Sequence, residues 1–129
     1  MAGRNNNQRP VYLNLLRIHL PVGGVVSILH RVTGVLLALL LPYSLWFLQQ
    51  SLASAEDYKR VTALLHTLPA RILLFVLLVM LAHHFFAGVR HLLLDLDIGV
   101  SRNAGKRGAW LVLAAVALVG ALAAERLFL

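Results

Sequence analysis

The sequence predicts an all-α membrane protein with three transmembrane helices, and three observations lead to this fold class. Hydrophobic residues make up 60% of the 129 residues and charged residues only 13%, whereas a soluble domain carries about a quarter charged residues. The mean hydropathy is +0.79. Three segments also approach the ~20 apolar residues that a helix needs to cross a bilayer. Helices are expected there because they satisfy their own backbone hydrogen bonds.

The predicted elements follow one another along a single domain. An amphipathic cytoplasmic segment over residues 1–21 precedes the first transmembrane helix, expected over about residues 22–49 with a kink at Pro42. The polar stretch "QQSLASAEDYKR" is interpreted as an outer loop. The second and third transmembrane helices are expected over about residues 63–94 and 107–127, and the turn-rich stretch "DIGVSRNAGKRG" joins them on the inside.

The distribution of charge predicts the orientation. The net charge is +7, but the basic residues flank apolar segments instead of forming a stripe, so nucleic acid is not the expected partner and membrane lipid is. With the N-terminus in the cytoplasm, the 12 Lys and Arg residues divide eight inside to four outside. The positive-inside rule therefore predicts a cytoplasmic N-terminus, a periplasmic C-terminus and a multi-pass protein of the bacterial inner membrane. The chain has no cysteine, which excludes disulfides and thiolate metal sites.

Two polar stripes are predicted at the cytoplasmic end of the bundle. At about 100° per residue, Ser27, His30, Arg31 and Gly34 share one face of the first span. In the second span the shared face carries a similar set of residues: His84, Gly88, His91 and Asp95. His83 points about 100° away from this second stripe, and His91 lies roughly 10 Å along the axis from His84.

This geometry suits a flat cofactor standing beside the second span. His84 can serve as an axial ligand of haem iron, with Gly88 leaving room for the porphyrin edge. His91, Arg31 and His30 can meet the propionate carboxylates, which need cationic partners. A single histidine cannot supply two axial imidazoles, so either one of the two adjacent histidines is unpartnered or the second ligand comes from another chain.

Simpler interpretations exist for each residue. Histidines near helix ends are often interfacial, a boundary arginine commonly snorkels to lipid phosphates, and Gly34 and Gly88 can be helix contacts. Asp95 can be the helix-end partner of His91 at spacing i, i+4. Two aligned stripes at one membrane end favour the cofactor interpretation over these single-residue explanations.

The stretches "RPVYLNL", "SILHRVTGV" and "HHFFAGVRHLLLD" together resemble the cytochrome b membrane-anchor subunit of succinate dehydrogenase, respiratory complex II. The resemblance covers almost the whole chain, so residues 1–129 are expected to form a single membrane-anchor domain. It implies that His84 is one axial ligand of a haem b shared with a second small anchor subunit. The pairs His30–Arg31 and Arg90–His91 match the family's two motifs, and His30, Arg31 and His91 are expected near the propionates.

The resemblance also implies a substrate and partners. Ser27 and Arg31 match the family's ubiquinone site, while Asp95 matches the acidic residue that ends the second motif and is a further candidate. The implied partners are an FAD flavoprotein that oxidises succinate and an iron–sulfur subunit that passes electrons to the quinone. This chain is then a non-flavin subunit of the enzyme, in electron transport and the tricarboxylic acid cycle.

Two other functions stay open from the sequence. One is a quinol:fumarate reductase anchor, which shares the same chemistry. The other is a non-enzymatic membrane scaffold or transporter subunit, although proton-coupled transporters usually carry an ionisable residue in mid-span, and the middles of these three spans lack one.

Overall fold

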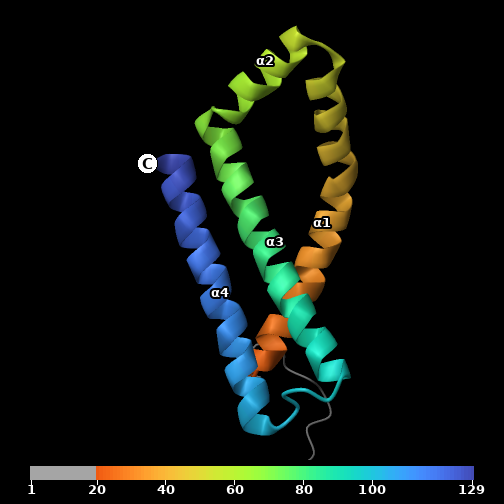
Figure 1. Ribbon diagram of the computed structural model, residues 1–129, viewed down its shortest axis with the longest axis vertical. Coiled ribbons are helices and arrows are strands. Elements are labelled where there is room, and N and C mark those ends of the chain that lie inside the picture. The colour runs from red at the N-terminus through yellow and green to blue at the C-terminus, as the bar shows by residue number, and fades with distance from the viewer. Residues whose placement is uncertain (1–19) are drawn as a thin grey trace, which may run out of the picture.

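The computed structural model describes residues 20–129 as four helices (Figure 1), with the bounds α1 (Val22–Ala53), α2 (Ala55–Leu65), α3 (Leu68–Asp95) and α4 (Arg102–Phe128). Helices α1, α3 and α4 are long and apolar enough to cross a membrane. The all-helical class with three candidate spans is therefore confirmed. The N-terminal segment predicted over residues 1–21 lies outside the described residues, apart from its last two.

Helix α1 begins after Pro21 and ends before Ser54, and both flanking residues have an extended backbone. Pro21 has extended backbone angles, and its carbonyl accepts hydrogen bonds from the N–H groups of Gly24 at 2.8 Å and Val25 at 3.2 Å. The helix continues through Pro42 as one element and ends at Ala53. The expected kink at Pro42 therefore does not divide the span.

The stretch predicted as an outer loop contains the helix α2. Its N-terminus is capped by Ser54, whose hydroxyl oxygen accepts a hydrogen bond from the Asp57 N–H at 3.0 Å. Glu56 and Asp57 occupy the first turn, where negative charge is favourable, and Arg60 lies 3.7 Å from one and 3.8 Å from the other. No residue of α2 is buried. The cap and the two acidic residues were local helix signals, although the prediction interpreted the stretch as a loop.

Helix α3 begins later than predicted, and α4 begins earlier. Thr67 is extended, and a proline in the first turn starts α3 at Leu68. Ser101 caps α4, because its hydroxyl accepts a hydrogen bond from the Ala104 N–H at 3.3 Å. The third span therefore includes the basic residues that the prediction placed in the inner loop.

The turn between α3 and α4 closes with a Schellman motif. The Ile98 N–H donates to the Leu93 carbonyl at 2.9 Å, and the Asp97 N–H donates to the Leu94 carbonyl at 3.0 Å. Asp97 takes the left-handed conformation with φ of 60°, which aspartate tolerates better than most residues. These bonds satisfy carbonyls at the end of α3 and reverse the chain toward α4.

The three long helices are arranged as one closely packed pair and one crossing helix (Figure 1). Helix α4 runs beside α3, whereas α1 crosses α3 near the start of α1 and diverges from it toward α2. We call the end with the α3–α4 turn the loop end and the opposite end the α2 end. The described core, Val26, Ala87, Ala109 and Val112, joins all three long helices.

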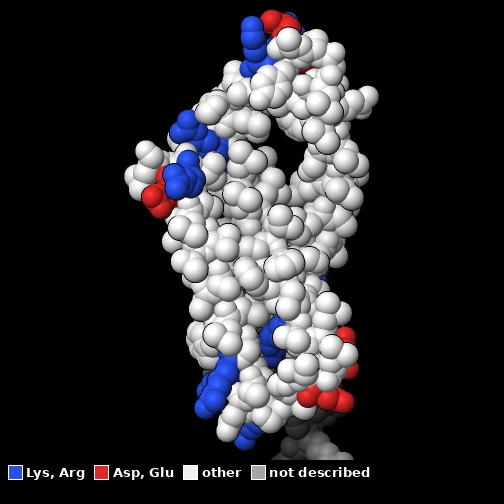
Figure 2. All heavy atoms as spheres, viewed as in Figure 1, with Lys and Arg blue, Asp and Glu red and all other residues white. Residues whose placement is uncertain are grey.

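The surface is apolar between two charged ends. Figure 2 shows Lys, Arg, Asp and Glu gathered toward the two ends, with a broad white band between them. Most large hydrophobic side chains of the described residues are exposed, including Leu39, Leu52 and Leu111 at 64%, 75% and 70%. Lipid or partner chains must cover this surface, because exposing so much apolar area to water is unfavourable.

The arrangement gives a testable orientation. A reporter enzyme that folds only in the periplasm should be active when fused after Leu129 and inactive when fused after Gly99 in the turn. The physical reason is the positive-inside rule, applied to the division of Lys and Arg that the sequence predicts, eight inside to four outside. Activity after Gly99 and none after Leu129 would reverse the proposed topology.

Candidate functional site

Three histidines from two helices form a cluster at the crossing of α1 and α3. The ring of His30 stacks on that of His84, with centroids 4.2 Å apart and planes 9° apart. The same ring lies 5.0 Å from that of His91 in a tilted arrangement. The structure therefore brings the two predicted polar stripes together through His30, whose ring lies against those of His84 and His91.

A glycine on each helix receives a histidine from the other helix. A Cβ atom added to Gly34 would lie 3.0 Å from Cε1 of His84, and one added to Gly88 would lie 3.3 Å from Nε2 of His30. The helices are antiparallel, and each histidine precedes its own glycine by four residues, so the contact is reciprocal. Gly88 was expected to leave room for a porphyrin edge, but in this chain that space faces His30, because α1 crosses α3 at this turn.

His84 is held through one ring nitrogen. Its Nδ1 lies 3.2 Å from the His30 carbonyl oxygen and 3.5 Å from Oγ1 of Thr33. Both hydrogen bonds that the ring makes within residues 20–129 involve Nδ1. His91 is also partly buried, and its own Nδ1 has no partner among the described residues.

His83 occupies a different environment from His84. Its side chain is only 5% exposed, and neither ring nitrogen has a hydrogen-bond partner among residues 20–129. It is one helix position from His84 and therefore points about 100° away around α3. The His30 ring stacks on His84 and not on His83.

The other predicted site residues lie outside this cluster. Ser27 is half-buried on α1, whereas Arg31 and Asp95 are exposed. Within the described part of the chain the ion pairs are confined to α2, so Asp95 and His91 do not form the pair that their spacing allows. Ser27 and Arg31 are one helical turn apart, roughly 6 Å along the axis of α1.

Arg90 has a role that the sequence did not reveal. Although it precedes His91, it faces α4, and its guanidinium donates a hydrogen bond to the Gly105 carbonyl at 3.2 Å. Added Cβ atoms at Gly23 and Gly108 would lie 3.3 Å and 3.6 Å from the same guanidinium. Glycines of α1 and α4 thus leave space for the arginine. On the α4 side, the glycines of "RNAGKRG" were the signal available in the sequence.

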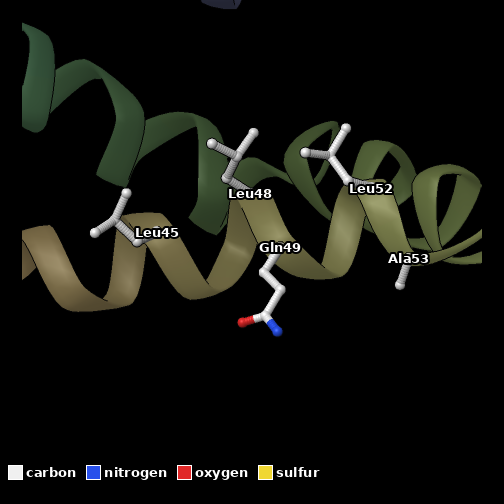
Figure 3. Close-up of a pocket in the computed structure, with 5 residues that line it drawn as sticks. All are labelled: Leu45, Leu48, Gln49, Leu52 and Ala53. Carbon is white, nitrogen blue, oxygen red and sulfur yellow. The ribbon is translucent and has the colours of Figure 1, made fainter.

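A hollow of about 530 Å³ lies far from the histidines, along the last turns of α1. In Figure 3 the side chains of Leu45, Leu48 and Leu52 point toward the neighbouring helices, whereas Gln49 points away from them. This lining carries no titratable group. The candidate site is therefore the histidine cluster and not this apolar hollow.

Three helices long and apolar enough to cross a membrane, two of which bring a cluster of imidazoles together, define the class: a small multi-pass membrane subunit with a candidate cofactor site. Residues 5–123 match the family described as the succinate dehydrogenase/fumarate reductase transmembrane subunit. The chain belongs to this family. It is also 35% identical over 108 residues to the succinate dehydrogenase cytochrome b556 subunit of Coxiella burnetii (strain RSA 493 / Nine Mile phase I), covering 83% of this chain and 86% of that protein.

The contacts of Arg90 predict its contribution to the loop end. Arg90→Ala should increase hydrogen exchange at residues 96–105, because a hydrogen bond to a charged donor contributes about 1.5–3 kcal/mol. Lys106→Ala, on the exposed side of the same turn of α4, is the matched control and should leave exchange unchanged. Equal exchange in the two variants would show that Arg90 does not fasten α3 to α4.

Proposed function

We propose that this chain is the membrane-anchor cytochrome b subunit of a bacterial succinate dehydrogenase. In this proposal it binds one haem b jointly with a second small anchor subunit and forms part of the ubiquinone-reduction site. The observation that carries the proposal is the arrangement of His84, fixed at Nδ1 against α1 within a chain of this family. The name of the Coxiella burnetii relative, a cytochrome b556 subunit, supports the haem.

The residues present fit a haem. A histidine that binds iron through one nitrogen usually engages the other nitrogen with a carbonyl or carboxylate. His84 has this arrangement, since the His30 carbonyl lies beside Nδ1 and leaves Nε2 for iron. His84 is the proposed axial ligand, and the other axial histidine is proposed to come from the second anchor subunit. The haem supplies one-electron redox chemistry when bound.

The distribution of charge also fits two propionates near the loop end. All five acidic residues of the chain lie at or near helix ends: Glu56, Asp57, Asp95, Asp97 and Glu125. Within the described residues no carboxylate pairs with the histidine cluster. His30, Arg31 and His91 are therefore proposed to meet the propionates, whose negative charge needs such partners in a medium of low polarity.

Ser27 and Arg31 supply the functional groups that quinone reduction needs. Reduction adds two electrons and two protons, and negative charge develops on the quinone carbonyl oxygens. The Ser27 hydroxyl can donate a hydrogen bond to one oxygen, and Arg31 can stabilise the charge. An arginine does not release its proton at neutral pH, so water or a neighbouring titratable group must deliver protons. Asp95 is a further candidate near the same end.

The proposed assembly places the chemistry at the cytoplasmic face of the inner membrane. The family makes an iron–sulfur subunit and an FAD flavoprotein the expected partners, and a site at the loop end lies within reach of a soluble subunit docked there. Apolar quinone from the membrane, electrons from the soluble subunits and protons from water can all meet at this boundary.

A quinol:fumarate reductase anchor is the second candidate, because the matched family includes both activities. Purification of the whole complex with this chain separates the two. A flavoprotein partner that oxidises succinate faster than it reduces fumarate supports the proposal, and the opposite preference supports the alternative.

The haem ligand is tested by replacing each of two adjacent histidines in the purified complex. His84→Leu should abolish the low-spin spectrum of a haem with two imidazole ligands, because an apolar side chain cannot bind iron. His83→Leu is the matched control, since it also removes an imidazole from the interior but on another face of α3. Loss of the spectrum in His83→Leu alone would assign the ligand to the other histidine.

The quinone site is tested with Ser27→Ala. Succinate-dependent quinone reduction should fall, since a lost hydrogen bond to a developing oxyanion commonly costs about 10²–10³ in rate, and less where a partner chain supplies a second donor. Succinate oxidation by an acceptor that takes electrons directly from the soluble subunits should persist. Full quinone reductase activity with unchanged haem content would remove Ser27 from the site.

A further inference from the structure

Thr33 and Gly34, which have no role in the proposed function, both lie against His84. Thr33 is buried at 7% exposure, and its Oγ1 lies 3.5 Å from Nδ1 of His84, at the outer limit of a hydrogen bond. The His84 ring packs directly on the backbone of Gly34, where an added Cβ would lie 3.0 Å from Cε1 and 3.4 Å from Nδ1 of the ring. Both residues therefore constrain one edge of the imidazole.

The hydrogen bonds of Thr33 determine which nitrogen of His84 carries hydrogen. The Thr33 hydroxyl donates to the backbone, since Oγ1 lies 2.8 Å from the Leu29 carbonyl and 3.1 Å from the His30 carbonyl. Its remaining lone pairs can then only accept, and the His30 carbonyl beside Nδ1 can also only accept. A ring nitrogen that faces two acceptors must be the protonated one. His84 is thus held as the tautomer with hydrogen on Nδ1 and a free lone pair on Nε2.

We propose that Thr33 and Gly34 are positioning residues for His84: the threonine oxygen and the His30 carbonyl fix its tautomer, and the missing side chain of Gly34 fixes its ring position. This inference rests on the proposed function, in which Nε2 of His84 binds haem iron. A hydrogen-bonded Nδ1–H makes the imidazole a stronger electron donor, which favours the ferric state. Thr33 therefore lowers the midpoint potential of the haem.

A simpler role for Thr33 is helix back-bonding alone, which buried serines and threonines commonly make. Ser44 provides a control for that role on the same helix. Its hydroxyl donates to the Leu40 carbonyl at 3.0 Å, but it is exposed in the half of α1 that diverges from α3. Removing the hydroxyl of Ser44 tests back-bonding without touching His84.

The experiment uses the purified complex and measures the haem itself. Thr33→Val keeps the shape of the side chain and removes the acceptor, so the midpoint potential should rise and the low-spin ferric electron paramagnetic resonance signal should shift. Thr33→Ser should restore both values, and Ser44→Ala should change neither. Unchanged potential and signal in Thr33→Val, with wild-type haem content, would overturn the role of Thr33.

Gly34→Ala tests the steric part against Gly24→Ala. The first must displace the His84 ring, and disturbing the support of a metal ligand commonly costs about 10–100-fold in affinity, so bound haem should fall. The second adds a methyl to the same helix with ordinary contacts of 3.7 Å to Pro21 and should retain haem. Wild-type haem content and spectrum in Gly34→Ala would overturn the steric role. If the purified wild-type complex contains no haem, both this inference and the proposed function are wrong.

Discussion

The reciprocal packing of histidine on glycine at the crossing of α1 and α3 is the contact on which the candidate site depends. Gly34 admits His84, Gly88 admits His30, and the two rings stack 4.2 Å apart. A side chain at either glycine would press on the ring that lies against it, because an added Cβ would lie 3.0 Å from His84 or 3.3 Å from His30. The crossing therefore determines both the helix separation and the place of the ring that is proposed to bind iron.

The rest of the loop end keeps this crossing in place. Arg90 connects α3 to α4 through the Gly105 carbonyl, and Val26 packs with Ala87 and Ala109 in the described core. The opposite half is different, because α1 diverges there and its leucines line an apolar hollow (Figure 3). Rigid packing is thus concentrated at the end that carries the polar residues, and the α2 end has less internal contact.

Unsatisfied polar atoms mark the same region. His91 Nδ1, Arg90 Nε and both nitrogens of His83 are buried without partners among the described residues. Such atoms are costly in an apolar medium, so they normally meet water, a ligand or another chain. Their concentration in the second half of α3 agrees with a subunit whose polar groups are completed by other components of a larger complex.

Local features of the sequence determined the three spans and the two polar stripes. Apolar length is a property of each segment alone. The angle between residues on a helix follows from their spacing, so the sequence was enough to assign two shared faces: Ser27, His30 and Gly34 on one helix, and His84, Gly88 and His91 on the other. The start of α3 near Pro69 also had a local signal. The helix α2 had a local signal too, because Ser54 precedes two acidic residues in its first turn, but this signal was interpreted as part of a loop.

The tertiary structure decided which of these side chains meet. The sequence placed His30 and His84 on faces of two helices, but only the crossing point of α1 and α3 put one ring on the other and gave each a glycine. It likewise turned Arg90 toward α4 and His91 toward α1, although the two are neighbours in the chain, and it brought Thr33 to Nδ1 of His84. Helical periodicity fixes the direction in which a side chain leaves its own helix axis. A contact also requires the position and tilt of a second helix, and these depend on packing between segments about 50 residues apart.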